Sequence, residues 1–518
     1  MIKLSDLEIT DIAYDSRKVK EGSLFVAIRG LKSDGHDFIG EAIGRGARVV
    51  VCEKPVILNE VKNLPRVPGR SFADAQDDIP FIIVPNSRIA LAQISSQFFK
   101  EPTRDLTVIG VTGTNGKTTI TYLLEAFLKA AACSPAVLGT INYRHEQKIY
   151  PATHTTPESH DLQKFIHQVK EEGCDALVME VSSHALDLHR VDAIHFDHCI
   201  FTNLTPEHLD YHQNLENYFK VKCRLFEELL LQSCKKNKKA ILNLDDPFVT
   251  QLALKFSKKN QLTFSLDAKK TADVFPLSYS LSLKGIQAEV QTSQGKLKVQ
   301  SPLLGAFNLS NLLAAIAVAA EMGISLSVLE EAIQNFKSVP GRLERVENSK
   351  GLHVFVDYAH TPDALKNVLS TLRTLLSQQH FPSPLMGEGQ GEGDSGCKRK
   401  LITVFGCGGD RDKSKRPLMG EEVAKPSDFV VVTSDNPRTE DPQKIIHEIL
   451  PGLLSQGWKE GKNFVVQIDR RKAIHQALAQ AQQGDIVLIA GKGHEDYQIL
   501  GNTKTHFDDR EVARELLK

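Results

Sequence analysis

A glycine-rich segment, residues 107–119, has the residue types and the order of a phosphate-binding loop. It reads TVIGVTGTNGKTT: an apolar strand, a turn with Gly113 and Gly116, and Lys117 at the start of a helix. The glycines permit a tight turn whose N–H groups converge on an anion, the helix N-terminus adds its positive end, and the lysine supplies a cation. The adjacent Thr118 is suited to bind Mg2+. The segment therefore predicts a polyphosphate site.

The same segment departs from the general pattern G-x-x-x-x-G-K-[ST] at one position. Val111 stands where that pattern has glycine, and Gly110 lies one residue too early. The alternative interpretation is a glycine-rich turn without a ligand. Gly-Lys-Thr-Thr between a strand and a helix favours the phosphate-binding interpretation.

Three further segments carry polar side chains that could meet the same phosphates. EVSSH (180–184) and FTNLTPEHLDYH (201–212) each follow a predicted strand, and a predicted helix carries Lys222. In an open α/β sheet the carboxyl ends of the strands line the ligand crevice. Glu180 is a hard oxygen ligand suited to Mg2+. His208 could bind a second metal ion, although a lone histidine is more often a surface or core residue.

Length and composition limit the class of protein. A chain of 518 residues has room for roughly three or four domains. Charged residues make up 25% and hydrophobic residues 41%, as in soluble globular proteins. With 63 basic and 64 acidic residues, the net charge of −1 disfavours a nucleic-acid or anionic-membrane partner.

Targeting and redox features agree with that class. The longest apolar run, residues 312–320, is too short to cross a membrane. The N-terminal residues lack the apolar core of a signal peptide, and the eight cysteines form no C-x-x-C pair. We expect a cytoplasmic monomer with reduced thiols that binds neither nucleic acid nor membrane.

Alternating apolar runs and helical patterns predict an α/β protein of three domains. Residues 1–105 are predicted to form a small α/β domain, residues 106–339 a mostly parallel sheet with helices on both faces, and residues 340–518 a Rossmann-like α/β domain. Residues 55–78 and 381–399, rich in proline or glycine and without periodicity, are predicted to be inserted surface loops. The predicted strands are 24–28, 49–52 and 81–84; 107–112, 176–180, 199–202 and 240–243; and 354–356, 401–405, 429–432 and 486–490.

Seven motifs in sequence order resemble those of one family. They are GTNGKTT, EVSSH, TNLTPEHLDYH, NLDDP (243–247), GAFNLSNLLAA (305–315), PGRLE (340–344) and DYAHTPDAL (357–365). This order is similar to that of the Mur ligases, the ATP-dependent ligases of peptidoglycan precursors, and it covers nearly the whole chain except the two inserts. The resemblance implies a central P-loop-type ATPase domain between a UDP-substrate-binding domain and an amino-acid-binding domain.

The resemblance also implies a reaction. ATP phosphorylates a substrate carboxylate, and an amine then displaces phosphate to form an amide. Because carboxylate and triphosphate repel each other, positive charge from Lys117 and two Mg2+ ions is needed where negative charge accumulates.

Catalytic, metal-binding and ATP-binding positions follow from the same resemblance. Lys117, His208 and Lys222 are catalytic; Thr118 and Glu180 hold one Mg2+, and His208 helps to hold the other. Lys222 matches a lysine carried as a carbamate, which supplies an anionic oxygen ligand; an unmodified lysine is the alternative, and Lys220 lies close by. The ATP-binding positions are Gly113, Thr114, Asn115, Gly116, Lys117, Thr118 and Thr119, with Asn308 and Asn311 near the adenine and Asp357 and His360 on the third domain.

Polar segments of the third domain indicate a pocket for a zwitterion. Arg411 and Arg438 offer planar forks to carboxylates, and Asp435 and Glu495 can accept from an ammonium group. DNPR (435–438) resembles the signature of the family member that adds meso-diaminopimelate. If lysine were the amino acid added, the arginine fork would lack a carboxylate partner. The alternative for DNPR is a turn whose arginine lies in solvent. The resemblance gives the diaminopimelate-binding set as Arg411, Asp435, Asn436, Pro437, Arg438, Gly491 and Glu495.

The N-terminal segment YDSRKVKEGSLFVAIRG (14–30) resembles the uridine-diphosphate region of the family. Leu31, Lys32 and Leu188 differ from the residues of some relatives. The positions that match UDP-substrate contacts are Tyr14, Ser16, His154, Thr155, Thr156, Ser182, Leu188 and Arg190. The implied substrates are UDP-N-acetylmuramoyl-L-alanyl-D-glutamate, meso-diaminopimelate and ATP. A folylpolyglutamate-type or other Mur-type ligase, and a nucleotide-binding regulatory protein without ligase activity, are the alternatives.

Overall fold

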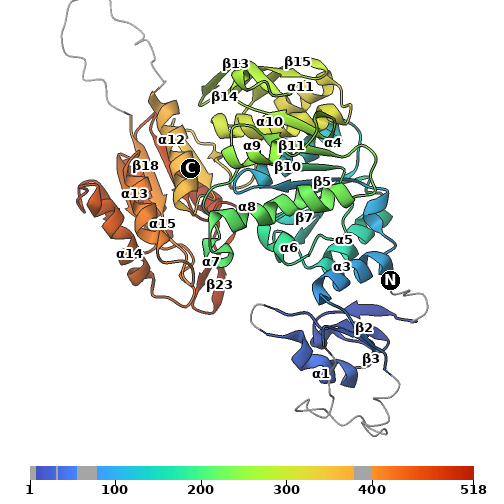
Figure 1. Cartoon of the computed structure of the whole chain (residues 1–518). Helices are drawn as coiled ribbons and strands as arrows, with labels where there is room; N and C mark the ends of the chain where they lie inside the picture. The colour runs from blue at the N-terminus through green and yellow to red at the C-terminus, as the bar shows by residue number, and fades with distance from the viewer. Residues whose placement is uncertain (1–7, 31–32, 55–78, 378–398) are drawn as a thin grey trace, which may run out of the picture.

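The structure is a computed structural model that describes residues 8–30, 33–54, 79–377 and 399–518, and it contains three α/β units built on separate parallel sheets (Figure 1). The predicted insert at 55–78, nearly all of the insert at 381–399, and Leu31 and Lys32 lie outside the described residues.

The first unit is a four-stranded parallel sheet in the order β1-β2-β3-β4. Helix α1 (Ile39–Gly44) packs on one face of this sheet and α3 (Ser87–Phe98) on the other, and each face has its own apolar core. The strands are β1 (Asp11–Ala13), β2 (Ser23–Val26), β3 (Ala47–Cys52) and β4 (Phe81–Ile83).

The central unit is an eight-stranded sheet in the order β12-β11-β10-β5-β9-β6-β7-β8. The first six strands are parallel, and β7 and β8 add an antiparallel hairpin at one edge. The strands are β5 (Thr107–Thr112), β6 (Pro135–Leu138), β7 (Asn142–His145), β8 (Lys148–Pro151), β9 (Ala176–Glu180), β10 (His198–Phe201), β11 (Lys239–Asn243) and β12 (Gln261–Phe264).

Helices cover both faces of the central sheet. Successive side chains of a strand point to opposite faces, so each strand contributes to a core on both sides. Ile109 and Val111 of β5 face one core, whereas Val108 faces the other. Helices on the first face are α4 (Lys117–Ala130), α10 (Ala306–Glu321) and α11 (Leu326–Asn335); those on the second include α5 (Ser159–Glu171), α8 (Leu215–Arg224), which continues as a π-helix (Leu225–Leu230), and α9 (Pro247–Ala253). Short helices α6 (Ser183–Asp187) and α7 (Leu209–His212) follow β9 and β10.

An antiparallel three-stranded sheet joins the central unit to the third one. It consists of β13 (Phe275–Ser282), β14 (Gly285–Thr292) and β15 (Gly295–Ser301). Its apolar face packs against α10 and α11, while Leu281 and Leu283 also pack into the core of the third unit. The sequence analysis did not predict this sheet, although apolar and polar residues alternate from Leu277 to Ser282 in β13.

The third unit is a six-stranded sheet in the order β16-β17-β21-β18-β19-β20, parallel except for β16. A hairpin of β22 (Tyr497–Leu500) and β23 (Thr503–His506) follows it. The strands are β16 (Glu344–Val346), β17 (His353–Asp357), β18 (Leu401–Phe405), β19 (Phe429–Val432), β20 (Phe464–Val466) and β21 (Ile486–Ala490). Helices α12 (Pro362–Ser377), α13 (Lys415–Ala424) and α14 (Pro442–Ser455) cover one face, and α15 (Arg470–Gln480) and α16 (Asp509–Leu517) the other.

The α/β class with mostly parallel sheets, predicted from the alternation of apolar runs and helical patterns, is confirmed. The edge strands and the antiparallel hairpins are additions that the sequence analysis did not contain. In the part of the chain that the structure describes, no helix is both long and apolar enough to cross a membrane.

A fully buried ion pair stabilises the third unit, and its loss should be measurable. Neither Arg470 nor Asp509 has exposed side-chain surface, and the guanidinium also bonds the carbonyl of Ala490 at the end of β21. Asp509→Asn removes the partner of a buried charge, so we expect a loss of about 3–5 kcal/mol in the free energy of unfolding. Calorimetry should show a lower melting temperature. Glu515→Gln, which breaks the exposed pair of the neighbouring Arg471, should cost about 0.5 kcal/mol or less.

Candidate functional site

The loop between β5 and α4 has a shape that only glycine permits at two positions. Gly113 and Gly116 have φ of +136° and +91°. A Cβ at Gly113 would lie 1.9 Å from the hydroxyl oxygen of Thr202, and one at Gly116 would lie 2.3 Å from the side-chain oxygen of Asn311. The two glycines therefore let the loop approach β10 and α10 closely.

Gly110, which breaks the general loop pattern, belongs to strand β5 rather than to the loop. A Cβ there would lie 2.7 Å from the ring of Phe196. The residue is glycine because an aromatic ring packs directly on the strand. The phosphate-loop shape in this chain thus depends on Gly113 and Gly116 alone.

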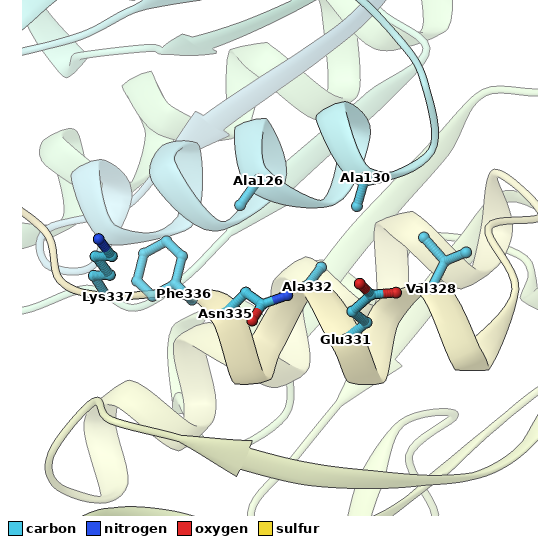
Figure 2. Close-up of a pocket in the computed structure, with 8 residues that line it drawn as sticks. All are labelled: Ala126, Ala130, Val328, Glu331, Ala332, Asn335, Phe336 and Lys337. Carbon is cyan, nitrogen blue, oxygen red and sulfur yellow. The ribbon is translucent and has the colours of Figure 1, made fainter.

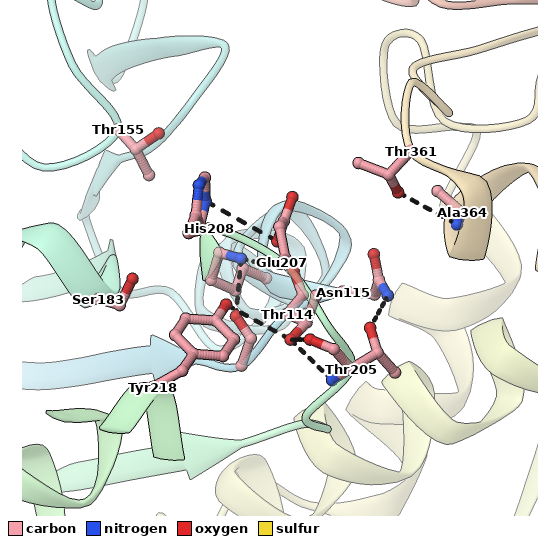
Figure 3. A network of polar contacts seen from close by, with 12 residues as sticks. Thr114, Asn115, Thr155, Ser183, Thr205, Glu207, His208, Tyr218, Thr361 and Ala364 are labelled. Atoms are coloured by element: carbon pink, nitrogen blue, oxygen red, sulfur yellow. Dashed lines mark hydrogen bonds and ion pairs between the residues drawn. The ribbon is translucent and has the colours of Figure 1, made fainter. Parts of the chain in front are cut away.

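The segment after β10 holds the loop in place (Figure 3). The N–H of Thr114 donates to the carbonyl of Asn203 at 2.9 Å, and the N–H of Asn115 donates to the side-chain oxygen of Asn203 at 2.9 Å. Thr202 donates its hydroxyl to the carbonyl of Asn115 at 2.6 Å. The sequence analysis placed these two segments at the same sheet edge but did not identify Asn203 as the anchor of the loop.

Two lysines meet at one backbone carbonyl of this loop. Lys117 Nζ donates to the carbonyls of Gly113 and Thr114 at 2.9 and 2.8 Å. Lys222 Nζ, on α8, donates to the same carbonyl of Gly113 at 3.0 Å and lies 4.5 Å from the ring centroid of Tyr218. Burial lowers the pKa of both amines, that of Lys222 well below its usual value. The charge of Lys117 lowers the pKa of Lys222 further. A buried amine with a depressed pKa is a nucleophilic amine.

The carboxylate of Glu180, at the end of β9, accepts hydrogen bonds from two threonines. It accepts from the Thr118 hydroxyl at 3.0 Å and from the hydroxyl and the N–H of Thr140, both at 2.9 Å. Among the described residues no three His, Cys, Asp or Glu side chains form a metal cluster. The hard oxygens of Thr118 and Glu180 fit Mg2+, provided that the remaining ligands come from the nucleotide or from a modified side chain.

His208 stands at the start of α7 with φ of +56° and packs its ring against His184, 4.9 Å between centroids. Burial lowers the pKa of His208 to about 4, so the ring is neutral at physiological pH, as a metal ligand must be. Its Nε2 lies 3.9 Å from Glu207 (Figure 3). Burial would raise the pKa of Glu207, but Lys117 and His208 lower it below its usual value. Glu207 lies within a quoted motif, yet the sequence analysis gave it no role.

Side chains of the third unit reach the loop. Asp363, at the start of α12, accepts from the Asn115 side-chain amide and from the Thr205 hydroxyl, both at 3.1 Å. Arg342 donates to the Thr118 hydroxyl at 3.3 Å and lies over the ring of Tyr358. The sequence analysis predicted neither contact, although Arg342 belongs to the quoted motif PGRLE.

The other predicted ATP-binding residues divide into two groups. The amide of Asn311 lies beside Gly116, next to the loop, and donates to Asn308 at 3.1 Å. Asp357, in contrast, accepts from the N–H groups of Leu343 and Ala359 within the third unit. His360 is exposed. Thr119 is buried in the first turn of α4.

The predicted amino-acid-binding residues lie at the carboxyl ends of β18, β19 and β21. Asp435, Asn436 and Pro437 are buried, and Glu495 accepts from the side-chain amide of Asn436 at 2.8 Å. A Cβ placed on Gly408 would lie 3.0 Å from the guanidinium of Arg438 and 3.8 Å from the side chain of Arg411. The two arginines therefore flank the same glycine. A Cβ at Gly491 would lie 2.9 Å from the carboxylate of Asp435.

The predicted UDP-substrate residues lie at two places. Tyr14 donates to Asp161 of α5 across the boundary between the first two units, whereas the Ser16 hydroxyl donates to Glu41 within the first unit at 2.8 Å. The remaining positions lie around the ends of β8 and β9. The hydroxyls of Thr155 and Thr140 share a hydrogen bond, and Thr156 donates to the carbonyl of Glu180. Ser182 and Leu188 cap the two ends of α6. The carbonyl of His154 accepts from the Tyr143 hydroxyl, and Arg190 donates to the carbonyl of Thr156.

A separate hollow of about 350 Å³ lies between α4 and α11 (Figure 2). Ala126 and Ala130 line it from α4, and Val328 and Ala332 line it from α11. Ala126 stands nine residues beyond Lys117, which is roughly 14 Å along the helix. No predicted site residue lines this hollow.

Family models match most of the chain. The Mur ligase family catalytic domain matches residues 8–99, the Mur ligase middle domain matches 111–319, and the Mur ligase glutamate ligase domain matches 341–382 and 393–493. The chain belongs to the Mur ligase family. This Mur ligase is 44% identical over 517 residues to the UDP-N-acetylmuramoyl-L-alanyl-D-glutamate--2,6-diaminopimelate ligase of Geobacter metallireducens, covering 98% of this chain and 93% of the relative.

Other relatives and solved structures agree. The ligase of the same name from Syntrophomonas wolfei is 42% identical over 513 residues, covering 99% of this chain and 95% of the relative. A solved structure of a UDP-N-acetylmuramoyl-L-alanyl-D-glutamate--2,6-diaminopimelate ligase is 33% identical, covers 98% of this chain and 94% of that chain, and superimposes with a TM-score of 0.65. The MurF ligase from Thermotoga maritima in complex with ADP, at 21% identity and a TM-score of 0.58, shares the fold and covers 99% of this chain and 97% of that chain.

The two loop glycines offer a test of the nucleotide site in this Mur ligase. Gly116→Ala places a methyl group against Asn311 at a positive φ, so we expect ATP affinity to fall at least about tenfold, roughly 1.4 kcal/mol. Gly173→Ala is the matched control, because Gly173 has φ of +93° but nothing within 4 Å of its Cβ. It should lower stability by about 1 kcal/mol and leave ATP affinity unchanged. Titration calorimetry with ATP and thermal unfolding separate the two effects; equal affinities in both variants would contradict the site.

Proposed function

We propose that this Mur ligase joins meso-2,6-diaminopimelate to the D-glutamate of UDP-N-acetylmuramoyl-L-alanyl-D-glutamate at the expense of ATP. The observation that carries the proposal is the placement of Arg438 and Arg411 beside Gly408, next to the acidic residues Asp435 and Glu495. A diamino diacid has the complementary ammonium and carboxylate groups at its far end. We also propose that the enzyme works in the cytoplasm as a monomer.

The reaction follows from the charges at the loop. The D-glutamate side-chain carboxylate attacks the γ-phosphorus, the bond to the β-phosphate oxygen breaks, and ADP leaves. Lys117, released from the carbonyls of Gly113 and Thr114, would neutralise charge on the transferred group. The incoming amine then attacks the acyl phosphate, loses a proton, and expels phosphate.

Two groups complete the phosphate site. Two Mg2+ ions would supply positive charge beside the phosphate oxygens; Thr118 and Glu180 would hold one, and the neutral ring of His208 would help to hold the other. The third-unit residues Arg342 and Asp363 contact the loop, so the relative position of the two units controls the shape of the nucleotide site. Arg342 would bring a guanidinium to the phosphate site beside Thr118.

A carbamate on Lys222 is part of the proposal. Lys222 is fully buried, its pKa lies well below its usual value because of burial, and Lys117 lies close by. An uncharged amine can attack CO2, forming an N–C bond and losing one proton. The product is anionic and would pair with the ammonium of Lys117, which favours the modified form at this position.

Substrate specificity is tested by phosphate release with the uridine-linked muramoyl dipeptide and a panel of amino acids. We expect release with meso-diaminopimelate and at least about 100-fold lower kcat/KM with lysine, because lysine leaves the guanidinium of Arg438 without a carboxylate. Arg438→Met should remove most of this preference, whereas Arg471→Met, at the exposed pair on α15, should keep it. Preference for lysine in the unmodified enzyme would refute the proposed substrate.

The carbamate is tested by removing dissolved CO2. We expect phosphate release to fall at least about tenfold in CO2-depleted buffer and to return when bicarbonate is added, because the carbamate reverts to the amine. Lys222→Met should be weakly active and insensitive to bicarbonate. Lys220→Met is the control, since Lys220 is exposed on the same helix, and it should respond to bicarbonate as the unmodified enzyme does. Full activity without CO2 would show that Lys222 acts as an amine.

A further inference from the structure

We propose that Lys492 is a positioning residue for the amino-acid recess, where its buried ammonium holds the side chains of Asp435, Asn436 and Glu495 in one charged cluster. The inference rests on the proposed function, because that function assigns these three residues to the incoming amino acid. Lys492 itself was given no role by the sequence analysis, although it directly follows Gly491, which that analysis assigned to the incoming amino acid.

The geometry of Lys492 is that of an internal counter-ion. Its side chain has no exposed surface, so it does not touch a substrate. Its Nζ lies 3.5 Å from a carboxylate oxygen of Glu495, 3.8 Å from Oδ1 of Asp435 and 3.5 Å from the side-chain oxygen of Asn436. It also donates to the carbonyl of Tyr497. A buried ammonium is tolerated only when it is paired in this way.

The cluster leaves one acceptor available. Asn436 donates its side-chain amide to Glu495 at 2.8 Å, whereas among the described residues nothing donates a hydrogen bond to Oδ1 of Asp435, which is buried. A buried acceptor without a donor is costly unless a ligand supplies one. Lys492 therefore attracts the carboxylate of Asp435 without occupying the position that a substrate ammonium would take.

Charge balance explains why a cation is needed behind the recess. Burial and the charge of Asp435 raise the pKa of Glu495, and Lys492 opposes that rise. Without Lys492, the pKa of Glu495 would rise further, and the recess would more readily lose a negative charge that binds an ammonium group. The other charged or titratable groups around Glu495 and Asp435 are Arg470, paired with Asp509, and Cys407, His360, Tyr358, Tyr497, Asp496 and Arg438.

The test is Lys492→Met in the full chain, with phosphate release as the assay. We expect the KM for diaminopimelate at pH 7 to rise about 30-fold, while the KM values for ATP and the uridine-linked substrate stay within about twofold. As the pH is raised, the KM of the variant should fall toward that of the unmodified enzyme, because a carboxyl group with a raised pKa loses its proton at higher pH. Lys492→Arg, which keeps the charge, should retain most of the affinity.

Lys504→Met is the matched control. Lys504 is exposed on β23, and its Nζ lies 3.8 Å from the ring centroid of Tyr497, the residue whose carbonyl Lys492 bonds. This variant should leave all three KM values unchanged at every pH. An unchanged or lowered KM for diaminopimelate in Lys492→Met, or a raised KM without any pH dependence, would overturn the proposal.

A second variant covers the case in which Lys492→Met does not fold. In Lys492→Met/Glu495→Gln one of the two carboxylates is gone, so the double variant should melt near the temperature of Glu495→Gln alone; a double variant as unstable as Lys492→Met would contradict the counter-ion role. The unmodified enzyme separates the two hypotheses. If it releases phosphate with another amino acid and not with diaminopimelate, the proposed function fails, and the Lys492 effect is then measured on the KM of that amino acid.

Discussion

The structure depends on the placement of two buried lysines at one backbone carbonyl, that of Gly113. Two ammonium groups cannot share a buried position at low cost, and the local structure resolves this in a specific way. Burial depresses the pKa of Lys222 far below its usual value, and Glu207 and Glu180 supply negative charge near Lys117. Lys117 thus carries the positive charge at this carbonyl, and the two acids balance it. The positions of β5, β9, β10 and α8 all serve to bring these side chains to the same edge of the central sheet.

The sequence analysis predicted that these segments meet at one edge of the sheet, because the carboxyl ends of parallel strands lie together. The buried strands β5, β9, β10 and β11 consist of apolar runs whose ends are marked by polar motifs, so both the element and the side chains that follow it could be identified. Gly113 and Gly116 were recognisable because a turn before a helix needs their backbone freedom. The glycine at position 110 could not be explained from the sequence, because it leaves room for the ring of Phe196, which lies 86 positions further along the chain.

The parts that could not be predicted depend on contacts between distant elements. Asp363 and Arg342 are ordinary polar residues of the third unit until the fold brings them to Asn115 and Thr118. The sheet β13–β15 was missed although its strands alternate apolar and polar residues, the pattern that predicts a half-buried strand; only continuous apolar runs were taken as strands in this part of the chain. The acidic residues and arginines of the recess in the third unit were predicted from their residue types. The buried ammonium of Lys492 behind them has no sequence signal apart from its place after β21.

The β13–β15 sheet contacts the third unit through apolar side chains, whereas the contacts at the loop are hydrogen bonds: Asn115 and Thr205 donate to Asp363, and Thr118 accepts from Arg342. Water can replace the polar contacts with little change in free energy, but it cannot replace Leu281 and Leu283 without exposing hydrocarbon. A relative motion of these two units would therefore keep the leucine contact as a pivot and open first at the loop. Nucleotide exchange would then need only a swing of the third unit and no separation of the two hydrophobic cores.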